Sequence, residues 1–134
     1  NGCVLHTGPL GSGKITKLIN NYVGGIQVVA MSEAFNLARV AGIDLKTAHA
    51  AMRGGMANCW ALNARPPYPA MDFSVDFIEK DMGYALLAAA QYGTSMMFGS
   101  HAREYYKAAH NRGEGGKDFS AVVHVVESLG KNEK

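Results

Sequence analysis

The sequence predicts an all-α fold. Apolar residues recur at helical spacing along most of the chain, and glycine and aspartate residues mark where the periodic segments end and begin. No convincing strand follows Thr7. With 134 residues, the chain fits one domain that can bury a sizeable core. We therefore expect one helical bundle, preceded by a short strand.

The first periodic segment begins at Ser12 and predicts a long helix that runs to about Val40. Gly24 and Gly25 lie in the middle of this helix, and Gly42 is expected to end it. The apolar stripe behind this prediction comprises Ile15, Leu18, Ile19, Tyr22, Ile26, Val29 and Ala30.

Shorter elements are expected in the middle of the chain. Asp44 can cap a helix over residues 45–52, which the glycines at 54–55 stop. A short helix is expected over residues 58–63. The prolines in residues 66–69 predict an extended loop.

Three more segments complete the bundle. A helix of about 20 residues is expected to end at Gly93, and a second helix follows it. Residues 112–116 predict a polar, glycine-rich loop, and Asp118 can cap a last helix. The apolar faces of these helices are Ile78, Met82, Ala85, Ala89 and Tyr92; then Phe98, Ala102, Tyr105 and Ala109; then Phe119, Val122, Val126 and Leu129.

The composition narrows the function classes. A net charge of +2 with scattered basic residues argues against a nucleic-acid-binding surface. No apolar run approaches the 18 or more residues of a membrane span, and no signal peptide is visible. Charged residues make up only 18% of the chain, so we expect part of the surface to be hidden against another domain or subunit. For Cys3 and Cys59, free thiols in a reducing compartment are favoured over a disulfide.

The start of the chain imitates a phosphate-binding loop. Residues 3–7 predict a short strand that runs into a turn, and residues 8–14 match the P-loop pattern up to its lysine. However, Ile15 occupies the position of the Ser or Thr whose hydroxyl holds magnesium. The parallel strands that this motif requires do not follow either. An NTPase therefore remains only a minor alternative.

One face of the first helix gathers polar residues beside the apolar stripe. Lys14, Lys17, Asn21, Gly24 and Val28 follow one another at spacings of three and four residues. Two amines and an amide therefore lie next to a glycine that leaves room for a ligand. Spacing alone also allows a solvated polar flank.

Several segments resemble the 3-hydroxyisobutyrate dehydrogenase family, the β-hydroxyacid dehydrogenases. Residues 11–21 resemble its signature G-x-G-x-x-x-K-x-x-N-N, and residues 79–83 its KDLG motif, with Phe73 seven residues before the lysine. Other similar stretches, in the family's order, are residues 32–38, 42–44, 58–60 and 117–120.

The resemblance implies a two-domain NAD(P)-dependent dehydrogenase. Residues 1–10 would be the linking strand and turn from an N-terminal Rossmann domain, and residues 11–134 a helical substrate and dimerisation domain. That domain would be a bundle of the 6-phosphogluconate dehydrogenase C-terminal type. Because the chain begins at Asn1 rather than Met, we expect it to be part of such a longer protein. A homodimer or homotetramer is expected, in the cytoplasm or, in a eukaryote, the mitochondrial matrix.

The resemblance also implies roles for individual residues. Oxidising a hydroxyacid removes a hydride and a proton, and an amine can carry the proton if burial or a second cation brings its pKa towards neutrality. The family's catalytic lysine corresponds to Lys17, and Asn21 can hydrogen-bond the substrate. Lys80 corresponds to the lysine that contacts the nicotinamide cofactor. The remaining expected substrate contacts are Gly11, Gly13, Phe73 and Asp81.

Other questions stay open at the level of sequence. No metal site is expected, since the histidines (His6, His49, His101, His110 and His124) show no ligand spacing. Trp60 is expected in the core or an interface. The sequence does not choose NAD over NADP, nor one hydroxyacid over another. A non-catalytic binding module of the same fold is the main alternative function.

Overall fold

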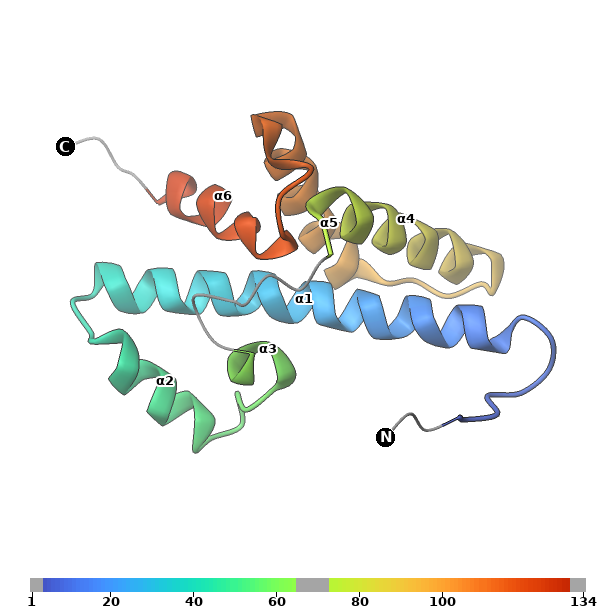
Figure 1. The fold of residues 1–134 in the computed structure, drawn as a ribbon, viewed down its shortest axis with the longest axis horizontal. Coiled ribbons are helices and arrows are strands. Elements are labelled where there is room, and N and C mark those ends of the chain that lie inside the picture. Colours follow the sequence, from blue (N-terminus) through green and yellow to red (C-terminus); the bar gives the residue numbers. More distant parts are fainter. Residues whose placement is uncertain (1–3, 65–72, 131–134) are drawn as a thin grey trace.

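A computed structural model describes residues 4–64 and 73–130. Helices account for 74% of these residues, and the described ranges contain no β-strand. The predicted all-α fold is confirmed. Figure 1 shows the long helix α1 (Ser12–Val40) through the middle of the molecule. Helices α4, α5 and α6 lie on one side of α1, and α2 and α3 on the other.

Glycine ends the two longest helices in the predicted way. After α1, Gly42 has a φ of 75°, its N–H donates to the Arg39 carbonyl, and the Ile43 N–H donates to the Ala38 carbonyl. This pattern satisfies carbonyl groups that the end of a helix leaves free. The same pattern ends α4 (Val75–Gln91), where Gly93 has a φ of 70°.

The short helices α2 (Leu45–Arg53) and α3 (Trp60–Asn63) agree with the prediction to within two residues at each end. The Asp44 carboxylate accepts the N–H of Thr47 at 2.9 Å, which is the predicted cap. Hydrogen bonds from the Thr47 backbone and hydroxyl hold the pKa of Asp44 below its ordinary value. The proline-rich segment 66–69 lies outside the described residues.

The C-terminal part differs from the prediction at one point. After α5 (Met97–Ala109), a π-helical turn, His110–Glu114, occupies the first half of the segment predicted as a loop. Glu114 anchors this turn, because Lys117 and His124 bond its carboxylate at 3.1 and 2.9 Å. Burial raises the pKa of Glu114, but these two contacts outweigh burial and leave it below its ordinary value.

The last helix begins as predicted. Asp118 accepts the N–H of Ser120 at 3.0 Å and caps a 3₁₀ turn, Phe119–Ala121, that leads into α6 (Val122–Leu129). Most of its predicted apolar face is buried in the core, but Leu129 is exposed.

The strand predicted at residues 3–7 was wrong for the part that the structure describes. Residues 4–7 have no regular structure and are exposed. A strand is stabilised by hydrogen bonds to a neighbouring strand, and within residues 4–64 and 73–130 the one β-bridge joins Ser74 to Asp118, far along the sequence. The parallel sheet of a P-loop NTPase is likewise missing from these ranges, which disfavours that alternative.

Two sequence expectations about environment can be compared with the structure. Cys59 is a free thiol, as expected, whereas Cys3 lies outside the described residues. Among the helices of the described ranges, none combines the length and apolarity that crossing a membrane requires.

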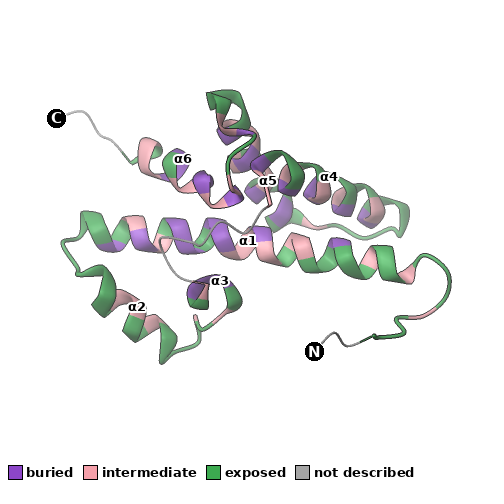
Figure 2. Ribbon diagram, in the orientation of Figure 1, coloured by how far each residue is buried: buried purple, intermediate pink, exposed green. Residues whose placement is uncertain are grey.

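The core forms where α1 meets α4, α5 and α6, as the buried surfaces in Figure 2 show. Gly25 lies at the crossing of α1 and α4. A Cβ atom at this position would stand 2.9 Å from the Met82 sulfur and 3.2 Å from a carbon of Ile78. The Tyr106 hydroxyl donates to the Gly25 carbonyl at 2.9 Å. Gly25 therefore lets two helices approach α1 closely. The largest fully buried side chains are Tyr106, Leu62, Ile78, Met82, Val28, Val75 and Val122.

Alanine should have opposite effects at the two adjacent glycines. Gly25→Ala should lower the free energy of unfolding by about 1–3 kcal/mol, because Met82 is fully buried and cannot move aside easily. At Gly24 the nearest atom, a carbon of the Trp60 ring, would be 3.9 Å from the Cβ. Gly24→Ala should therefore leave stability unchanged or raise it by up to about 1 kcal/mol. Urea unfolding followed by circular dichroism measures both, and equal effects would contradict this packing.

Candidate functional site

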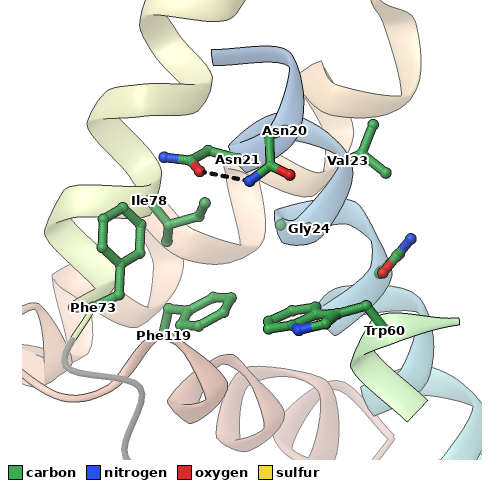
Figure 3. Close-up of a pocket in the computed structure, with 10 residues that line it drawn as sticks. Asn20, Asn21, Val23, Gly24, Trp60, Phe73, Ile78 and Phe119 are labelled. Atoms are coloured by element: carbon green, nitrogen blue, oxygen red, sulfur yellow. Dashed lines mark hydrogen bonds between the residues drawn. The ribbon is translucent and has the colours of Figure 1, made fainter. Parts of the chain in front are cut away.

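A pocket of about 500 Å³ opens beside the N-terminal half of α1. Figure 3 shows side chains that converge on it from α1, from the start of α3, from the segment around α4 and from the turn before α6. The lining residues are Asn20, Asn21, Val23, Gly24, Gly25, Gln27, Trp60, Phe73, Ile78 and Phe119. Its wall is apolar towards α3 and α6, and its polar groups are amides of α1.

A hydrogen bond between α1 and α4 orients the side-chain amide of Asn21. The Asn21 Nδ2 group donates to the Asp81 carboxylate at 2.7 Å. A carboxylate only accepts, so the NH₂ end of Asn21 must face Asp81. The opposite end, Oδ1, accepts from Asn20 at 3.3 Å, shown by the dashed line in Figure 3. Two residues predicted to contact substrate, 60 positions apart in the sequence, are thus brought together.

Lys17 lies one helical turn before Asn21. Four residues along an α-helix advance about 6 Å and rotate by about 40°, and the seven residues to Gly24 differ in direction by only about 20°. Lys17 therefore shares the face of α1 that carries Asn21 and Gly24, as the spacing predicted. Its side chain is exposed, and it lies next to the pocket rather than among the lining residues.

The polar face predicted on α1 is shorter than expected. Lys14 is exposed and does not line the pocket, while Val28 is completely buried in the core. Gly24 lines the pocket and faces Trp60, whose ring would be 3.9 Å from a Cβ at this position. The part of α1 that lines the pocket therefore runs from Asn20 to Gln27, and Lys17 lies just before it.

Aromatic rings form the opposite wall. The Trp60 and Phe119 rings are nearly parallel, with centroids 6.5 Å apart and an interplanar angle of 12°. Phe73 meets Phe119 edge-on at 6.0 Å. Trp60, expected in the core or an interface, is about half exposed, so it is not a core residue, and it lines the pocket. Phe73, expected near substrate, also lines it.

Lys80 lies over Phe77, a further aromatic residue that packs against Phe73. Its ammonium group lies 5.0 Å from the centroid of the Phe77 ring, and Phe77 packs against Phe73 at 5.9 Å. A cation over an aromatic face is held there by the ring quadrupole. Lys80 is exposed and does not itself line the pocket, but the residue after it is Asp81, the partner of Asn21.

The two glycines of the signature stand apart from the pocket. Gly11 has a φ of 95° and caps the N-terminus of α1, where the backbone requires glycine. Gly13 faces Thr7, whose hydroxyl oxygen would be 3.8 Å from a Cβ at that position. Neither lines the pocket, so their predicted contacts with substrate have no support in this geometry. No metal-binding cluster of His, Cys, Asp or Glu was found within residues 4–64 and 73–130.

Sequence comparison identifies the family. The profile described as "NAD-binding of NADP-dependent 3-hydroxyisobutyrate dehydrogenase" matches residues 11–126. The chain belongs to this family. The match confirms the resemblance seen in the sequence and agrees with the predicted cofactor class, NAD or NADP.

Individual relatives agree with this assignment. A probable 3-hydroxyisobutyrate dehydrogenase of Mycobacterium tuberculosis is 33% identical over 138 residues, covering 93% of this chain and 46% of the relative. An NAD-dependent L-serine dehydrogenase of Pseudomonas aeruginosa is 30% identical over 136 residues, covering 92% and 46%.

A solved structure shares the fold. The structure of M. tuberculosis 3-hydroxyisobutyrate dehydrogenase with L-serine aligns with a TM-score of 0.82 at 33% identity, covering 91% of this chain and 46% of that one. The chain therefore spans about half the length of the family members it matches.

Sequence reasoning missed part of the pocket. Asn20 and Gln27 lie three and ten residues after Lys17, so they share its face, and a closer reading of the helical spacing could have included them. Phe119 and Trp60 come from distant segments, and no local pattern indicates that their rings stack beside α1.

A second carboxylate at position 21 should disturb the contact with Asp81. In Asn21→Asp, two carboxylates would meet at hydrogen-bond distance, which raises the pKa of one of them in the folded state. A carboxyl group whose pKa is higher in the folded than in the unfolded state destabilises the fold at pH 7. This loss of stability disappears as the pH falls to about 4, the pKa of a carboxyl group in the unfolded chain. We expect a loss of about 1–2 kcal/mol at pH 7 that shrinks near pH 4.

The adjacent Asn20→Asp provides the control, because Asn20 is exposed and bonds Asn21 rather than Asp81. Urea unfolding of both variants and the wild type at the two pH values measures the effect. Equal stabilities of the two variants at pH 7 would show that the contact between Asn21 and Asp81 does not form.

Proposed function

We propose that this chain is the substrate-side helical domain of an NAD(P)-dependent dehydrogenase that acts on a small β-hydroxyacid. The observation that carries the proposal is the shared face of α1. It presents the Lys17 amine and, one turn further, an Asn21 amide held in one orientation by Asp81, beside a pocket of about 500 Å³.

The rest of the enzyme would come from a second domain. Family members are about twice as long as this chain, and an N-terminal Rossmann domain would bind most of the dinucleotide. The matched family profile describes NAD binding in the region that this chain covers. That description fits a contribution from Lys80, whose amine is exposed next to the aromatic row and can donate hydrogen bonds to oxygen atoms of a dinucleotide.

The chemistry divides between cofactor and protein. The nicotinamide supplies the hydride acceptor in oxidation and the hydride donor in reduction. The amine of Lys17 takes the proton of the substrate hydroxyl in oxidation and returns it to the carbonyl oxygen in reduction. Asn21 remains neutral in both directions, and its amide hydrogen-bonds the reacting oxygen or the substrate carboxylate.

Asp81 acts through Asn21. Its carboxylate holds the Asn21 NH₂ group at 2.7 Å, so one hydrogen of that planar group faces Asp81 and the other remains as a donor for a ligand. Because the amide is already oriented, it does not have to reorient when the substrate reacts, as a freely rotating amide would.

The names of the relatives suggest the substrate class. They include 3-hydroxyisobutyrate and L-serine dehydrogenases. Both compounds are 3-hydroxypropionates with a substituent on C2, which is a methyl group in the first and an ammonium group in the second. We propose the same arrangement for the substrate of this enzyme.

Replacement of the catalytic lysine should abolish most turnover. In the longer protein that carries this chain, Lys17→Ala should lower kcat by roughly 10²–10⁴-fold, the range for a general acid–base. Dinucleotide affinity should hardly change, because the other domain binds most of the cofactor. Steady-state kinetics of hydroxyacid oxidation, with dinucleotide binding measured separately, gives both quantities.

Lys14→Ala is the matched control, since Lys14 is exposed on the same helix, about one turn further than Lys17 from the residues that line the pocket. Its kcat should stay within about threefold of wild type. A near-normal kcat for Lys17→Ala would refute the proposed role of Lys17. A wild-type protein that binds dinucleotide but oxidises no hydroxyacid would instead be a non-catalytic binding module.

The second lysine should act on the cofactor. Lys80→Ala should weaken dinucleotide binding by more than it lowers kcat at saturation, because its amine acts in binding rather than in proton transfer. Titration of the dinucleotide and kcat at saturating cofactor separate the two effects. A large fall in kcat with unchanged dinucleotide affinity would assign Lys80 to the chemical step instead.

A further inference from the structure

Part of the apolar surface of α1 stays outside the core. Seven apolar residues follow one another at spacings of 4, 4, 3, 4, 4 and 3 residues, which is a repeat of 11. Such a repeat gives about 3.67 residues per turn, close to the α-helical 3.6, so these residues form a nearly straight stripe about 33 Å long. This outer stripe comprises Ile15, Ile19, Val23, Ile26, Ala30, Ala34 and Leu37.

Neighbouring helices approach α1 on either side of the outer stripe. Helices α5 and α3 lie on opposite sides of α1 (Figure 1). On the α5 side, Glu33 accepts a hydrogen bond from the Tyr105 hydroxyl. On the α3 side, the Gln27 side-chain oxygen accepts the N–H of Ala61 at 3.4 Å. The outer stripe runs between these two contacts and faces away from the crossing with α4 at Gly25.

The large side chains of the outer stripe are open. The exposed fraction is 51% for Ile19, 44% for Val23 and 70% for Leu37. Ala30 is exposed as well, and Ile26 is partly buried against the core. Single apolar residues on a surface are ordinary, but a continuous row along a whole helix is typical of a surface that another protein covers.

The sizes of these residues fit a second copy of the same helix. A two-fold axis at Ile26 sets two α1 helices antiparallel. To within about one residue, Ile19 then lies opposite Ala34 of the second copy, and Val23 lies opposite Ala30. Large side chains of one half thus meet small ones of the other half, as close packing requires. A parallel pair would instead set large against large and leave gaps between the alanines.

We infer that two copies of this chain associate through the outer stripe, with their α1 helices antiparallel. The contact is isologous, because the same surface of each copy faces the other. Val23 also lines the pocket, so the second copy lies along one edge of the candidate site. The inference goes beyond the proposed function and does not depend on it.

The test places opposite charges at one position and measures the dimer dissociation constant of the longer protein by sedimentation equilibrium. Glu33 is exposed and precedes Ala34, so in the antiparallel pair it lies near position 19 of the second copy. Ile19→Glu would bring carboxylates together at both ends of the contact, whereas Ile19→Lys would pair each new amine with a carboxylate. Ile19→Glu should raise the dissociation constant on the order of 10-fold more than Ile19→Lys does, because like charges oppose association.

Leu87→Glu is the control for a new charge on an exposed apolar residue, because Leu87 is 61% exposed on α4 and lies outside the outer stripe. It should leave the dissociation constant unchanged. Circular dichroism checks that each variant is folded. Leu37→Glu carries the test if Ile19→Glu is not folded, since Leu37 is 70% exposed, and it should also weaken the dimer.

The other outcomes contradict the inference in different ways. A wild-type protein that is monomeric at micromolar concentrations overturns it, and so does an Ile19→Glu variant that associates like the wild type. Equal weakening by Ile19→Glu and Ile19→Lys, or by Leu87→Glu, rules out the antiparallel contact. If Ile19→Glu lowers the melting temperature of the longer protein but not its association, the outer stripe contacts another part of the same chain. The proposed function survives each of these results, since the kinetics of Lys17→Ala test it separately.

Discussion

Helix α1 crosses α4 at Gly25, and the candidate site depends on this close approach. The missing side chain lets Met82 and Ile78 pack against the backbone of α1, and Tyr106 of α5 bonds the Gly25 carbonyl from the core. One turn towards the N-terminus of α1, the same pair of helices places Asp81 at 2.7 Å from Asn21. A larger spacing between the helices would separate these two side chains. Core packing and the orientation of a functional amide are thus consequences of one contact.

The pocket joins elements that have no local relationship in the sequence. Helix α1 contributes a face of amides and a glycine, while the aromatic wall comes from residues 60, 73 and 119. Two of these wall residues are held by another contact: Trp60 by the bond between its neighbour Ala61 and Gln27, and Phe73 by the edge of Phe119. Such a site is largely formed before a ligand binds, which reduces the entropy lost on binding.

Helix-capping residues and glycines with positive φ made much of the fold predictable from the sequence. The ends of α1 and α4 follow from Gly42 and Gly93, whose positive φ closes a helix, and the start of α2 follows from the Asp44 cap. Residues 4–7 of the predicted strand have no regular structure, because β-propensity needs a neighbouring strand to become a strand. In the π-helical turn after α5, Glu114 bonds Lys117 three residues on and His124 ten residues on, and contacts of this kind leave no periodic signal in the sequence. Helical spacing placed Lys17, Asn21 and Gly24 on one face of α1, and two of these residues, Asn21 and Gly24, line the pocket. The contact of Asn21 with Asp81 and the position of Trp60 required the assembled fold.

The central claim is that the Lys17 face of α1 holds the reacting hydroxyacid. A crystal structure of the longer protein with a β-hydroxyacid and a nicotinamide dinucleotide tests it most directly. We expect the C3 hydroxyl within hydrogen-bond distance of the Lys17 amine and the Asn21 amide bonded to the same acid. An acid bound away from α1, or bound with its hydroxyl out of reach of Lys17, would contradict the account.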